Sequence, residues 1–362
     1  MRRMTLPLAA LLTLFMGQAQ ATSLFQQDSI LVSSEHNLYA FSPSGSLRSR
    51  VPIPINASGE QARDLTLIGS DAVAVFNGTF SPLLSVMDAQ GWSSRSIDGW
   101  STVNNISYGG MASLGSQLFL TDGATSGGAA RGIISLDTVS GDYQRYLTDS
   151  DYIDITLGQD GNLYALRDTY GSLDVIDPST LTLLHTVNLG YSSYSRGVTA
   201  SANGDLYVAG WNGFVSHYSA SGELLDTLDI GGNLTDIDIN HAGAIAVGSR
   251  FGNIYLTDLS LATFTAVSVS SGVTFTAFAE VNMPPAPPQL TASKSRKGAW
   301  ITTTLSWTTQ ASGVDVYFND VLRDSINGEQ GSVSYTEHKK EAQTYKICNA
   351  GTELCAPVYV AN

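Results

Sequence analysis

The chain has 362 residues, of which 32 are Asp or Glu and 18 are Lys or Arg, so its formal net charge is −14. This acidic balance argues against nucleic acid as a partner, because phosphate binding needs a basic surface, and it disfavours anionic membranes for the same reason. No segment after residue 21 approaches 18 consecutive apolar residues, so no membrane insertion is expected.

Residues 1–21 have the features of a secretory signal peptide: two Arg, an apolar run from Leu6 to Met16, and Ala19-Gln20-Ala21 before the expected cleavage site. The apolar run is too short to span a membrane. The residue directly after the expected cleavage site is Thr22 and not Cys, which argues against a bacterial lipid anchor. We therefore expect a secreted or periplasmic protein of a Gram-negative bacterium.

Residues 152–189 contain four short strands, separated by turns that carry Gly, Pro, Asp or Ser. The second of these strands recurs along the chain, and its first residues are 43, 45, 45, 43 and 39 positions apart: Ile30, Val73, Leu118, Leu163, Leu206 and Ile245. Four strands within this period are typical of a propeller blade, and a lone four-stranded meander cannot bury both of its faces. The sequence therefore predicts an all-β fold with a six-bladed β-propeller over residues 22–283.

The two ends of the repeat array are predicted to complete each other. No room for a first strand precedes Ile30 after the signal peptide, and residues 273–281 form a strand with no followers. We expect this strand to join the N-terminal strands in one blade, which closes the ring and removes its open edge.

A second domain follows a Pro-rich linker at residues 284–289. Residues 290–362 alternate polar and apolar side chains in short segments, which predicts a small β-sandwich. Cys348 and Cys355 flank a tight turn between its last two strands, and export would expose them to an oxidising compartment, so we expect a disulfide. A metal site is disfavoured there because no His or further Cys lies nearby.

Residues 161–190, "GNLYALRDTYGSLDVIDPSTLTLLHTVNLG", resemble the NHL and YVTN-type repeats of exported propellers, and residues 204–232 do so more weakly. This resemblance implies a binding platform, although related six-bladed rings include lactonases and a lyase. Trp307 and "YKICNAG" (345–351) resemble the fibronectin type III modules appended to secreted bacterial hydrolases. The second resemblance covers residues 290–362 only.

One face of the predicted propeller carries the candidate binding residues. In a four-stranded meander, second-to-third loops and blade-to-blade loops share a face, and the long loops 56–63, 99–108 and 121–131 all lie there. Arg and aromatic residues on this face are typical of recognition sites, because they bury area and keep a polar group. The alternative is that these Arg pair with carboxylates such as Asp64 and Asp168 and only hold loops together. The predicted binding residues are Arg63, Trp100, Tyr108, Arg131, Tyr152, Arg167, Tyr170, Tyr194, Arg196, Trp211 and Arg250.

Asp64, Asp154 and Asp236 begin the innermost strands of alternate blades, so three carboxylates would surround a narrow channel. Such a ring is a candidate metal site for a hard cation such as Ca²⁺. The alternative is that each Asp caps backbone N–H groups where its strand begins. The corresponding positions in two of the other blades hold Gly110 and Gly197.

No His–Cys, His–Asp–Ser or H-x-x-H spacing is present, so no catalytic residue and no cofactor other than Ca²⁺ is predicted. The favoured hypothesis is a secreted, non-catalytic binding protein whose loop face recognises a glycan or a protein partner. The alternative is a metal-assisted hydrolase or lyase that acts on a polysaccharide or lactone in the propeller funnel. A structural matrix component is a third possibility.

Overall fold

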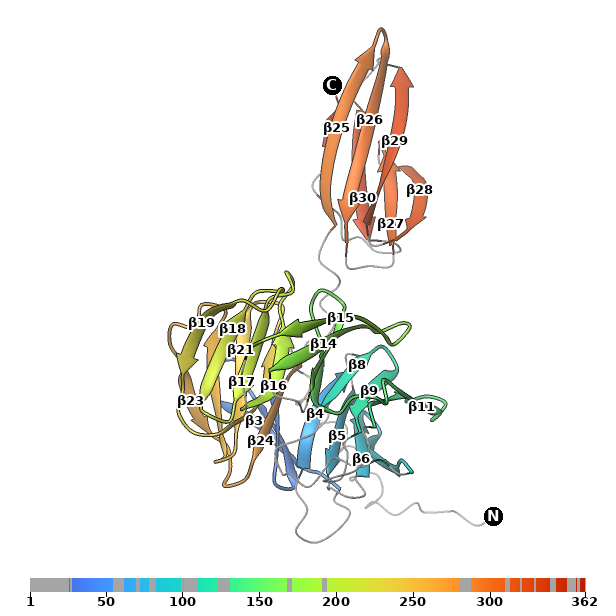
Figure 1. Cartoon of the computed structure of the whole chain (residues 1–362). Coiled ribbons are helices and arrows are strands. Elements are labelled where there is room, and N and C mark those ends of the chain that lie inside the picture. Colours follow the sequence, from blue (N-terminus) through green and yellow to red (C-terminus); the bar gives the residue numbers. More distant parts are fainter. Residues whose placement is uncertain are drawn as a thin grey trace, which may run out of the picture. The chain divides into compact units, whose positions relative to one another are not determined.

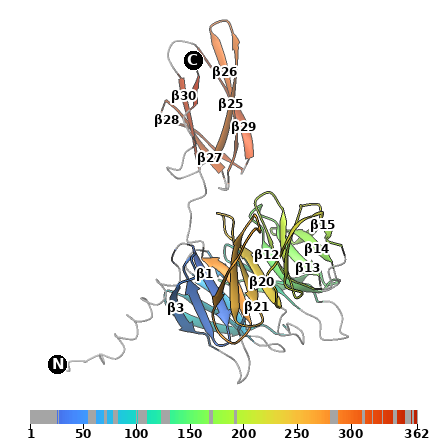
Figure 2. The same cartoon turned by 90° about the vertical axis from the view of Figure 1, so that its left-hand side faces the viewer.

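The computed structural model describes residues 26, 28–54, 62–69, 72–77, 83–98, 100, 110–122, 131–167, 171–190, 194–279, 288–309, 313–319, 321–328, 330–338, 343–349, 356 and 359–361. The chain divides into two compact units, Met1–Val281 and Asn282–Asn362 (Figures 1 and 2). Within the described ranges, the regular secondary structure consists of β-strands. A search of the same ranges finds no helix that could cross a membrane.

The described strands of the N-terminal unit form six four-stranded antiparallel sheets, numbered here in chain order. The first three are sheet 1, with β24 (Thr274–Ala279), β1 (Ser29–Ser34), β2 (Asn37–Phe41) and β3 (Leu47–Pro52); sheet 2, with β4 (Ala62–Ile68), β5 (Ala72–Asn77), β6 (Leu83–Asp88) and β7 (Gly91–Ser96); and sheet 3, with β8 (Met111–Leu114), β9 (Gln117–Thr121), β10 (Ile133–Asp137) and β11 (Tyr143–Tyr146).

The remaining three sheets follow the same order of strands from the innermost to the outermost. They are sheet 4, with β12 (Tyr152–Leu157), β13 (Leu163–Arg167), β14 (Ser172–Asp177) and β15 (Thr182–Asn188); sheet 5, with β16 (Ser195–Ala200), β17 (Leu206–Gly210), β18 (Phe214–Tyr218) and β19 (Leu224–Asp229); and sheet 6, with β20 (Leu234–Ile239), β21 (Ala244–Ser249), β22 (Asn253–Asp258) and β23 (Thr265–Ser268).

The C-terminal strand of this unit closes the array, as the sequence predicted. β24 pairs with β1 in antiparallel register, from Ser29 opposite Ala279 to Ser34 opposite Thr274. The innermost strands β4, β8, β12, β16, β20 and β24 are neighbours in that order, and β24 also contacts β4. The circuit of sheets is therefore closed, which is the arrangement of a β-propeller and leaves no open inner edge.

Burial follows the position of each strand within its sheet. Every residue of β2 and β17 is buried, whereas six of the seven residues of β15 are exposed. The apolar cores lie between adjacent sheets: Leu31, Leu65 and Phe275 share one cluster, and Leu166 and Val208 share another. Because both faces of the middle strands contact a neighbouring sheet, those strands are almost continuously apolar.

Four innermost strands begin with a β-bulge. The ladder register shifts between Ala62 and Leu65 in β4, between Tyr152 and Asp154 in β12, between Ser195 and Gly197 in β16, and between Leu234 and Asp236 in β20. A bulge changes the direction of nearby side chains. Six of the candidate site residues considered below lie at these bulges: Arg63, Asp64, Tyr152, Asp154, Arg196 and Asp236.

The C-terminal unit contains two sheets that share one core. The three-stranded sheet has β25 (Gln289–Lys297), β26 (Trp300–Thr308) and β29 (Gln330–His338), and the four-stranded sheet has β28 (Val321–Asn327), β27 (Gly313–Phe318), β30 (Gln343–Asn349) and β31 (Tyr359–Ala361). Leu305 and Trp307 of the first sheet pack with Val316, Tyr345 and Ile347 of the second.

Cys348 is buried in β30 and is not a free thiol. Its predicted partner, Cys355, lies outside the described residues, so the pairing stays a prediction.

Candidate functional site

The predicted binding residues do not form one continuous surface. Tyr108 and Tyr170 lie outside the described residues. Trp100 is only 2% exposed, its ring centroid lies 5.1 Å from that of Phe76, and its indole Nε1 donates to the carbonyl of Thr121 at 3.1 Å. Because this side chain belongs to the core between sheets 2 and 3, we remove Trp100 from the proposed contact residues.

Tyr152 and Arg167 both contact the buried carboxylate of Asp174. The Tyr152 hydroxyl donates to Asp174 Oδ2 at 2.7 Å, and Arg167 donates to the same oxygen from Nε at 2.9 Å and from Nη2 at 2.8 Å. Burial, together with the hydrogen bond to Asp174, raises the pKa of Tyr152 well above its ordinary value. The alternative of Arg–Asp pairing therefore holds at Arg167, with Asp174 as the partner.

Asp122 forms a second such centre. Its Oδ2 atom lies 3.1 Å from Arg131 Nη2 and 2.7 Å from Arg145 Nε, and its side chain is fully buried. Arg63 is 5% exposed, and its carbonyl accepts a hydrogen bond from the hydroxyl of Ser33 in sheet 1. Arg63 and Arg131 thus contribute to packing and loop connection within the unit.

The other predicted residues gather around Trp211, in the turn between β17 and β18. The guanidinium carbon of Arg196 lies 5.5 Å from the centroid of the Trp211 ring, and that of Arg250 lies 5.2 Å from it. Tyr194 is 49% exposed and Phe251 is 60% exposed. We call these five residues the Trp211 cluster.

Backbone and side-chain hydrogen bonds join the three segments that carry this cluster to one another and to a fourth segment at Asn233. Trp211 N donates to Tyr194 O at 2.6 Å, Asn233 Nδ2 donates to Trp211 O at 2.8 Å, and Arg250 N donates to Asn233 O at 2.9 Å. These segments are two second-to-third turns and two loops between sheets, so the predicted sharing of one face holds here. The contacts fix the loops before any ligand arrives, which lowers the entropic cost of binding.

Asn233 was missed by the sequence analysis as a supporting residue. Its side chain and its carbonyl link the turns of sheets 5 and 6. The available signal is weak: an Asn directly before an innermost strand, in a loop between repeats. Phe251 belongs to the loop aromatics but lay outside the predicted contact residues.

Asp64, Asp154 and Asp236 each connect one innermost strand to the next. Asp64 Oδ2 accepts the N–H of Met111, Asp154 Oδ2 accepts that of Val198 at 2.7 Å, and Asp236 Oδ2 accepts that of Thr276 at 2.6 Å. The three bonds join β4 to β8, β12 to β16 and β20 to β24. Each carboxylate therefore accepts a backbone N–H of the next innermost strand. This role is similar to the alternative in which each Asp caps backbone N–H groups at the start of its own strand.

All three aspartates have a raised pKa. Burial is the largest cause for Asp64, and the negative charges of Asp236 and Asp154 add to it. Burial followed by the charge of Asp236 raises the pKa of Asp154. Burial raises the pKa of Asp236 to about 6, against the lowering effect of its hydrogen bonds to Thr276 and Ile237. Burial and mutual repulsion thus make all three carboxyl groups harder to ionise than an exposed Asp.

No set of three or more His, Cys, Asp or Glu side chains in the described part of the chain is arranged to hold a metal ion. The second oxygen of Asp64 accepts the N–H of Leu65 at 2.8 Å, so both oxygens of that carboxylate are already engaged. The donor atoms thus fit backbone N–H groups better than a cation. Calcium binding by the three aspartates stays a prediction.

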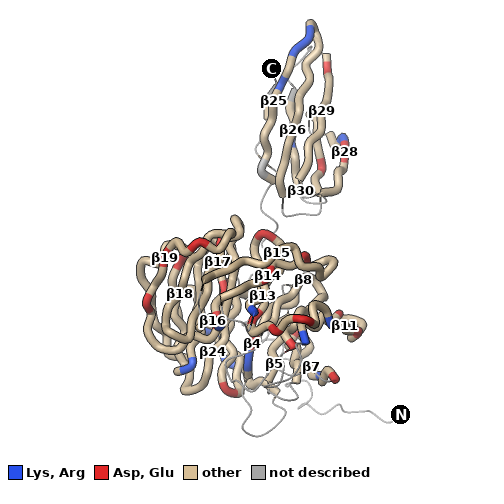
Figure 3. Tube along the Cα trace, in the orientation of Figure 1, with Lys and Arg blue, Asp and Glu red and all other residues tan. Residues whose placement is uncertain are grey.

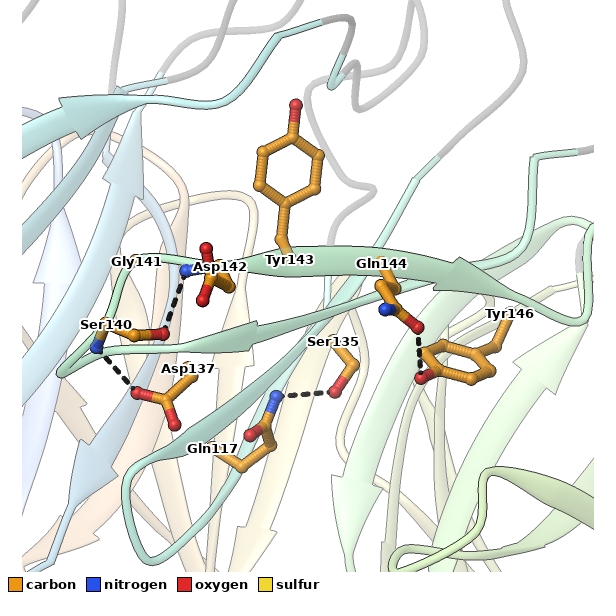
Figure 4. A pocket seen from close by; sticks show the side chains of 9 residues that line it. All are labelled: Gln117, Ser135, Asp137, Ser140, Gly141, Asp142, Tyr143, Gln144 and Tyr146. Carbon is orange, nitrogen blue, oxygen red and sulfur yellow. Dashed lines mark hydrogen bonds between the residues drawn. The ribbon is translucent and has the colours of Figure 1, made fainter.

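A separate polar depression of about 620 Å³ lies along β9, β10 and β11 (Figure 4). Asp137 Oδ1 accepts the N–H of Ser140 at 2.9 Å, and Gln117 Nε2 donates to Ser135 Oγ at 2.6 Å. None of its lining residues belongs to the predicted set. Its polar groups bond to one another and stabilise the β10–β11 hairpin, so we assign no ligand to it.

Acidic residues are spread along the strands and turns of the N-terminal unit, where basic residues are sparse (Figure 3). Residues 22–283 contain 21 Asp, 4 Glu and 9 Arg but no Lys. Two arginines beside one half-buried loop tryptophan are therefore a local exception to the charge of this unit.

No protein-family model matches the chain, and no curated protein matches its sequence. Solved structures give distant similarities. A streptogramin B lyase structure has a TM-score of 0.46 and 14% identity, and the match covers 67% of this chain and 87% of that one. Virginiamycin B lyase from Staphylococcus aureus has a TM-score of 0.46 and 13% identity, and the match covers 74% of this chain and 84% of that one. A catalytically inactive variant of that lyase with quinupristin has a TM-score of 0.45 and 14% identity, and the match covers 80% of this chain and 94% of that one. No function of this chain follows from similarities of this size.

Proposed function

We propose that residues 22–283 form a six-bladed β-propeller and residues 290–362 an appended fibronectin type III-like β-sandwich. In this proposal the chain is exported after loss of residues 1–21 and acts as a non-catalytic glycan-binding protein. The closed circuit of innermost strands and the shared core of the two C-terminal sheets support the architecture. The features of residues 1–21 support export.

The observation that carries the binding function is the Trp211 cluster. Aromatic rings stack on the apolar faces of sugars, while guanidinium and amide groups bond to the hydroxyls. Tyr194 and Phe251 are exposed large side chains on loops that hydrogen bonds hold in place. Gly210, Asn212 and Gly213 flank Trp211 in the sequence and Gly252 follows Phe251, so the loops carry small and polar residues next to each aromatic ring.

This composition favours a glycan over a protein partner. Stable protein interfaces bury about 800 Å² on each partner around a continuous apolar core. The cluster offers single aromatic rings between polar and small residues, which suits a chain of hydroxylated rings.

The alternative function, a metal-assisted hydrolase or lyase, would need the carboxylates of Asp64, Asp154 and Asp236 as metal ligands or acid/base groups. Their hydrogen bonds to backbone N–H groups across the strands disfavour that role. Turnover of a polysaccharide or lactone that depends on divalent ions and is lost in Asp154→Asn would establish the alternative.

Titration calorimetry with the full mature chain and a panel of soluble polysaccharides tests the proposal. We expect Trp211→Ala to weaken binding by about 2 kcal/mol, which is about thirtyfold in Kd. Trp300→Ala is the matched control, because Trp300 is an exposed tryptophan of the other unit. His241→Ala, in the β20–β21 turn, controls for the opposite face. A panel without any binding, or equal losses in Trp211→Ala and Trp300→Ala, would contradict the proposed function.

A further inference from the structure

We propose that the Trp211 cluster is a subsite for a negatively charged sugar unit, so that the ligand is an acidic polysaccharide bearing carboxylate or sulfate groups. This inference rests on the proposed glycan-binding function and narrows it. The juxtaposition that carries it is one indole ring approached by the guanidinium groups of Arg196 and Arg250.

The two positive charges are close together. Each guanidinium carbon lies within 5.5 Å of the same ring centroid, so the two carbons are at most about 11 Å apart. The screening length of physiological salt is about 8 Å, so an anionic group that binds beside the Trp211 ring is attracted by the guanidinium group that it faces. The two arginines come from different sheets, Arg196 from β16 and Arg250 from the β21–β22 turn.

Arg250 differs from the other arginines that border the loops. Arg131 and Arg167 lie within 3.1 Å of a buried Asp carboxylate, which compensates their charge. Arg250 is exposed and forms no ion pair with any described residue. In a unit with 25 acidic residues and 9 Arg, a guanidinium that no described carboxylate neutralises is available to an external anion.

Asp229, the last residue of β19, is the acidic residue next to the β19–β20 loop, and its carboxylate bonds within that loop. Asp229 Oδ1 accepts the N–H of Gly231 at 3.1 Å, and that bond shapes the loop itself. The loop then continues to Asn233, which holds both the Trp211 turn and the Arg250 turn. The arrangement fixes the positions of the cations while leaving the outer face of Arg250 accessible.

The chemistry of the guanidinium group defines the ligand further. A planar guanidinium forms paired hydrogen bonds with carboxylate or sulfate oxygens, and these charge-assisted bonds are stronger than bonds to neutral hydroxyls. The neighbouring exposed rings of Tyr194 and Phe251 accept the apolar face of the same or the adjacent sugar. A polymer that repeats both features along its length fits the subsite.

Calorimetry with the full mature chain tests this subsite with charge-matched pairs of polymers. Polygalacturonate is compared with its methyl ester, and chondroitin sulfate with desulfated chondroitin, so that the carboxylate and sulfate sources are separated. Poly-glutamate serves as a polyanion without sugar. We expect at least one charged polysaccharide to bind about tenfold or more tightly than its neutral partner and than poly-glutamate, with affinity falling as NaCl rises.

Arg250→Gln should remove most of that preference and reduce the salt dependence, whereas Arg250→Lys should keep part of it. Arg50→Gln is the matched control. Arg50 lies on the outermost strand β3, and its guanidinium carbon is 5.6 Å from the centroid of the Tyr39 ring. Retained melting temperatures would show that the variants are folded.

Three results would overturn the inference: equal affinity for charged and neutral polymers, poly-glutamate binding as tight as that of the polysaccharides, or equal losses in Arg250→Gln and Arg50→Gln. Neutral binding that Trp211→Ala abolishes would leave the glycan-binding function standing without an anionic subsite. Absence of binding to every polysaccharide would contradict the proposed function itself.

Discussion

The N-terminal unit should lose stability as the pH rises from 5 to 7.5, because of the three buried aspartates. A carboxyl group whose pKa is raised in the folded state stabilises the fold when it is protonated. For Asp236 this contribution is complete below the unfolded value of 3.8 and is lost as the pH rises through about 6. Asp64 and Asp154 are also raised, so they act in the same direction.

The size of the effect follows from the two pKa values of Asp236. A difference of about 2 units corresponds to roughly 3 kcal/mol between fully acidic and neutral conditions, of which about 1 kcal/mol lies between pH 5 and pH 7.5. A domain of this size shifts its Tm by about 2–4 °C for each kcal/mol. With Asp64 and Asp154 adding to Asp236, we expect Tm to fall by at least about 3 °C over this interval.

Other aspartates act in the opposite direction, but at lower pH. Hydrogen bonds from Ser140 and Val139 hold the pKa of Asp137 below its ordinary value, and Ser179 does the same for Asp177. Their contributions are present above the unfolded pKa of 3.8 and are lost as the pH falls below it. Measurements above pH 4.5 therefore isolate the effect of the central aspartates.

Differential scanning calorimetry of the full mature chain at several pH values measures this dependence. Asp236→Asn removes one titrating group and also the charge that raises the pKa of Asp64 and Asp154, so the change in Tm between pH 5 and 7.5 should fall by more than half. Asp137→Asn, in an exposed turn, should leave that change as it is. A wild-type Tm that is constant or rises from pH 5 to 7.5, or an equal flattening in Asp137→Asn, would refute the reasoning.

Three further outcomes are expected. Non-reducing mass spectrometry of exported protein should find Cys348 and Cys355 oxidised, and reduction should destabilise the C-terminal unit by about 2.5 kcal/mol; alkylated thiols in unreduced protein would exclude the bridge. Trp100→Ala should destabilise the N-terminal unit by about 3–5 kcal/mol without changing glycan affinity in the folded fraction, and a selective loss of affinity would return Trp100 to the contact residues. Gly110→Ala should destabilise more than Gly115→Ala, because a Cβ at Gly110 would lie 2.3 Å from the backbone N of Ile155, whereas the space at Gly115 is open and only the strain of its φ of 59°, about 1 kcal/mol, opposes a side chain; similar stabilities in urea titration would contradict this packing.

The repeated four-stranded sheets could be predicted because the middle strands are apolar on both faces. Leu163–Arg167 and Leu206–Gly210 recur at a regular spacing, and each lies between two neighbouring sheets. The pairing of β24 with β1 followed from a strand without followers and a repeat without its first strand. Both inferences depend on local composition and counting, which a single sequence contains.

The roles of individual loop residues could not be predicted in the same way. Trp100 and Trp211 both follow a strand of the array and look alike in sequence, but Phe76 and other core residues of sheets 2 and 3 enclose Trp100. Arg167 was predicted to bind a ligand, with pairing to a carboxylate such as Asp168 as the alternative. Its partner Asp174 stands opposite Ala165, which makes it the diagonal cross-strand neighbour of Arg167. Register and packing decide such contacts, and the sequence does not contain them directly.

The alternation of Asp and Gly from β4 to β20 has a steric cause that only the assembled strands reveal. Gly110 directly precedes β8, whose Met111 N–H bonds to Asp64 on one side; a Cβ at Gly110 would lie 2.6 Å from the Cα of Asp154 on the other. Gly197 stands in the same relation to Asp236, with a Cβ distance of 2.7 Å to its Cα, next to the Val198 N–H that bonds to Asp154. Each of these strands therefore donates to one aspartate and leaves room for the next. The third donor strand differs, because Phe275, with a buried side chain, precedes the Thr276 N–H that bonds to Asp236. The close approach that excludes a side chain is thus found at two of the three donor strands, β8 and β16, and the three aspartates connect the innermost strands in pairs.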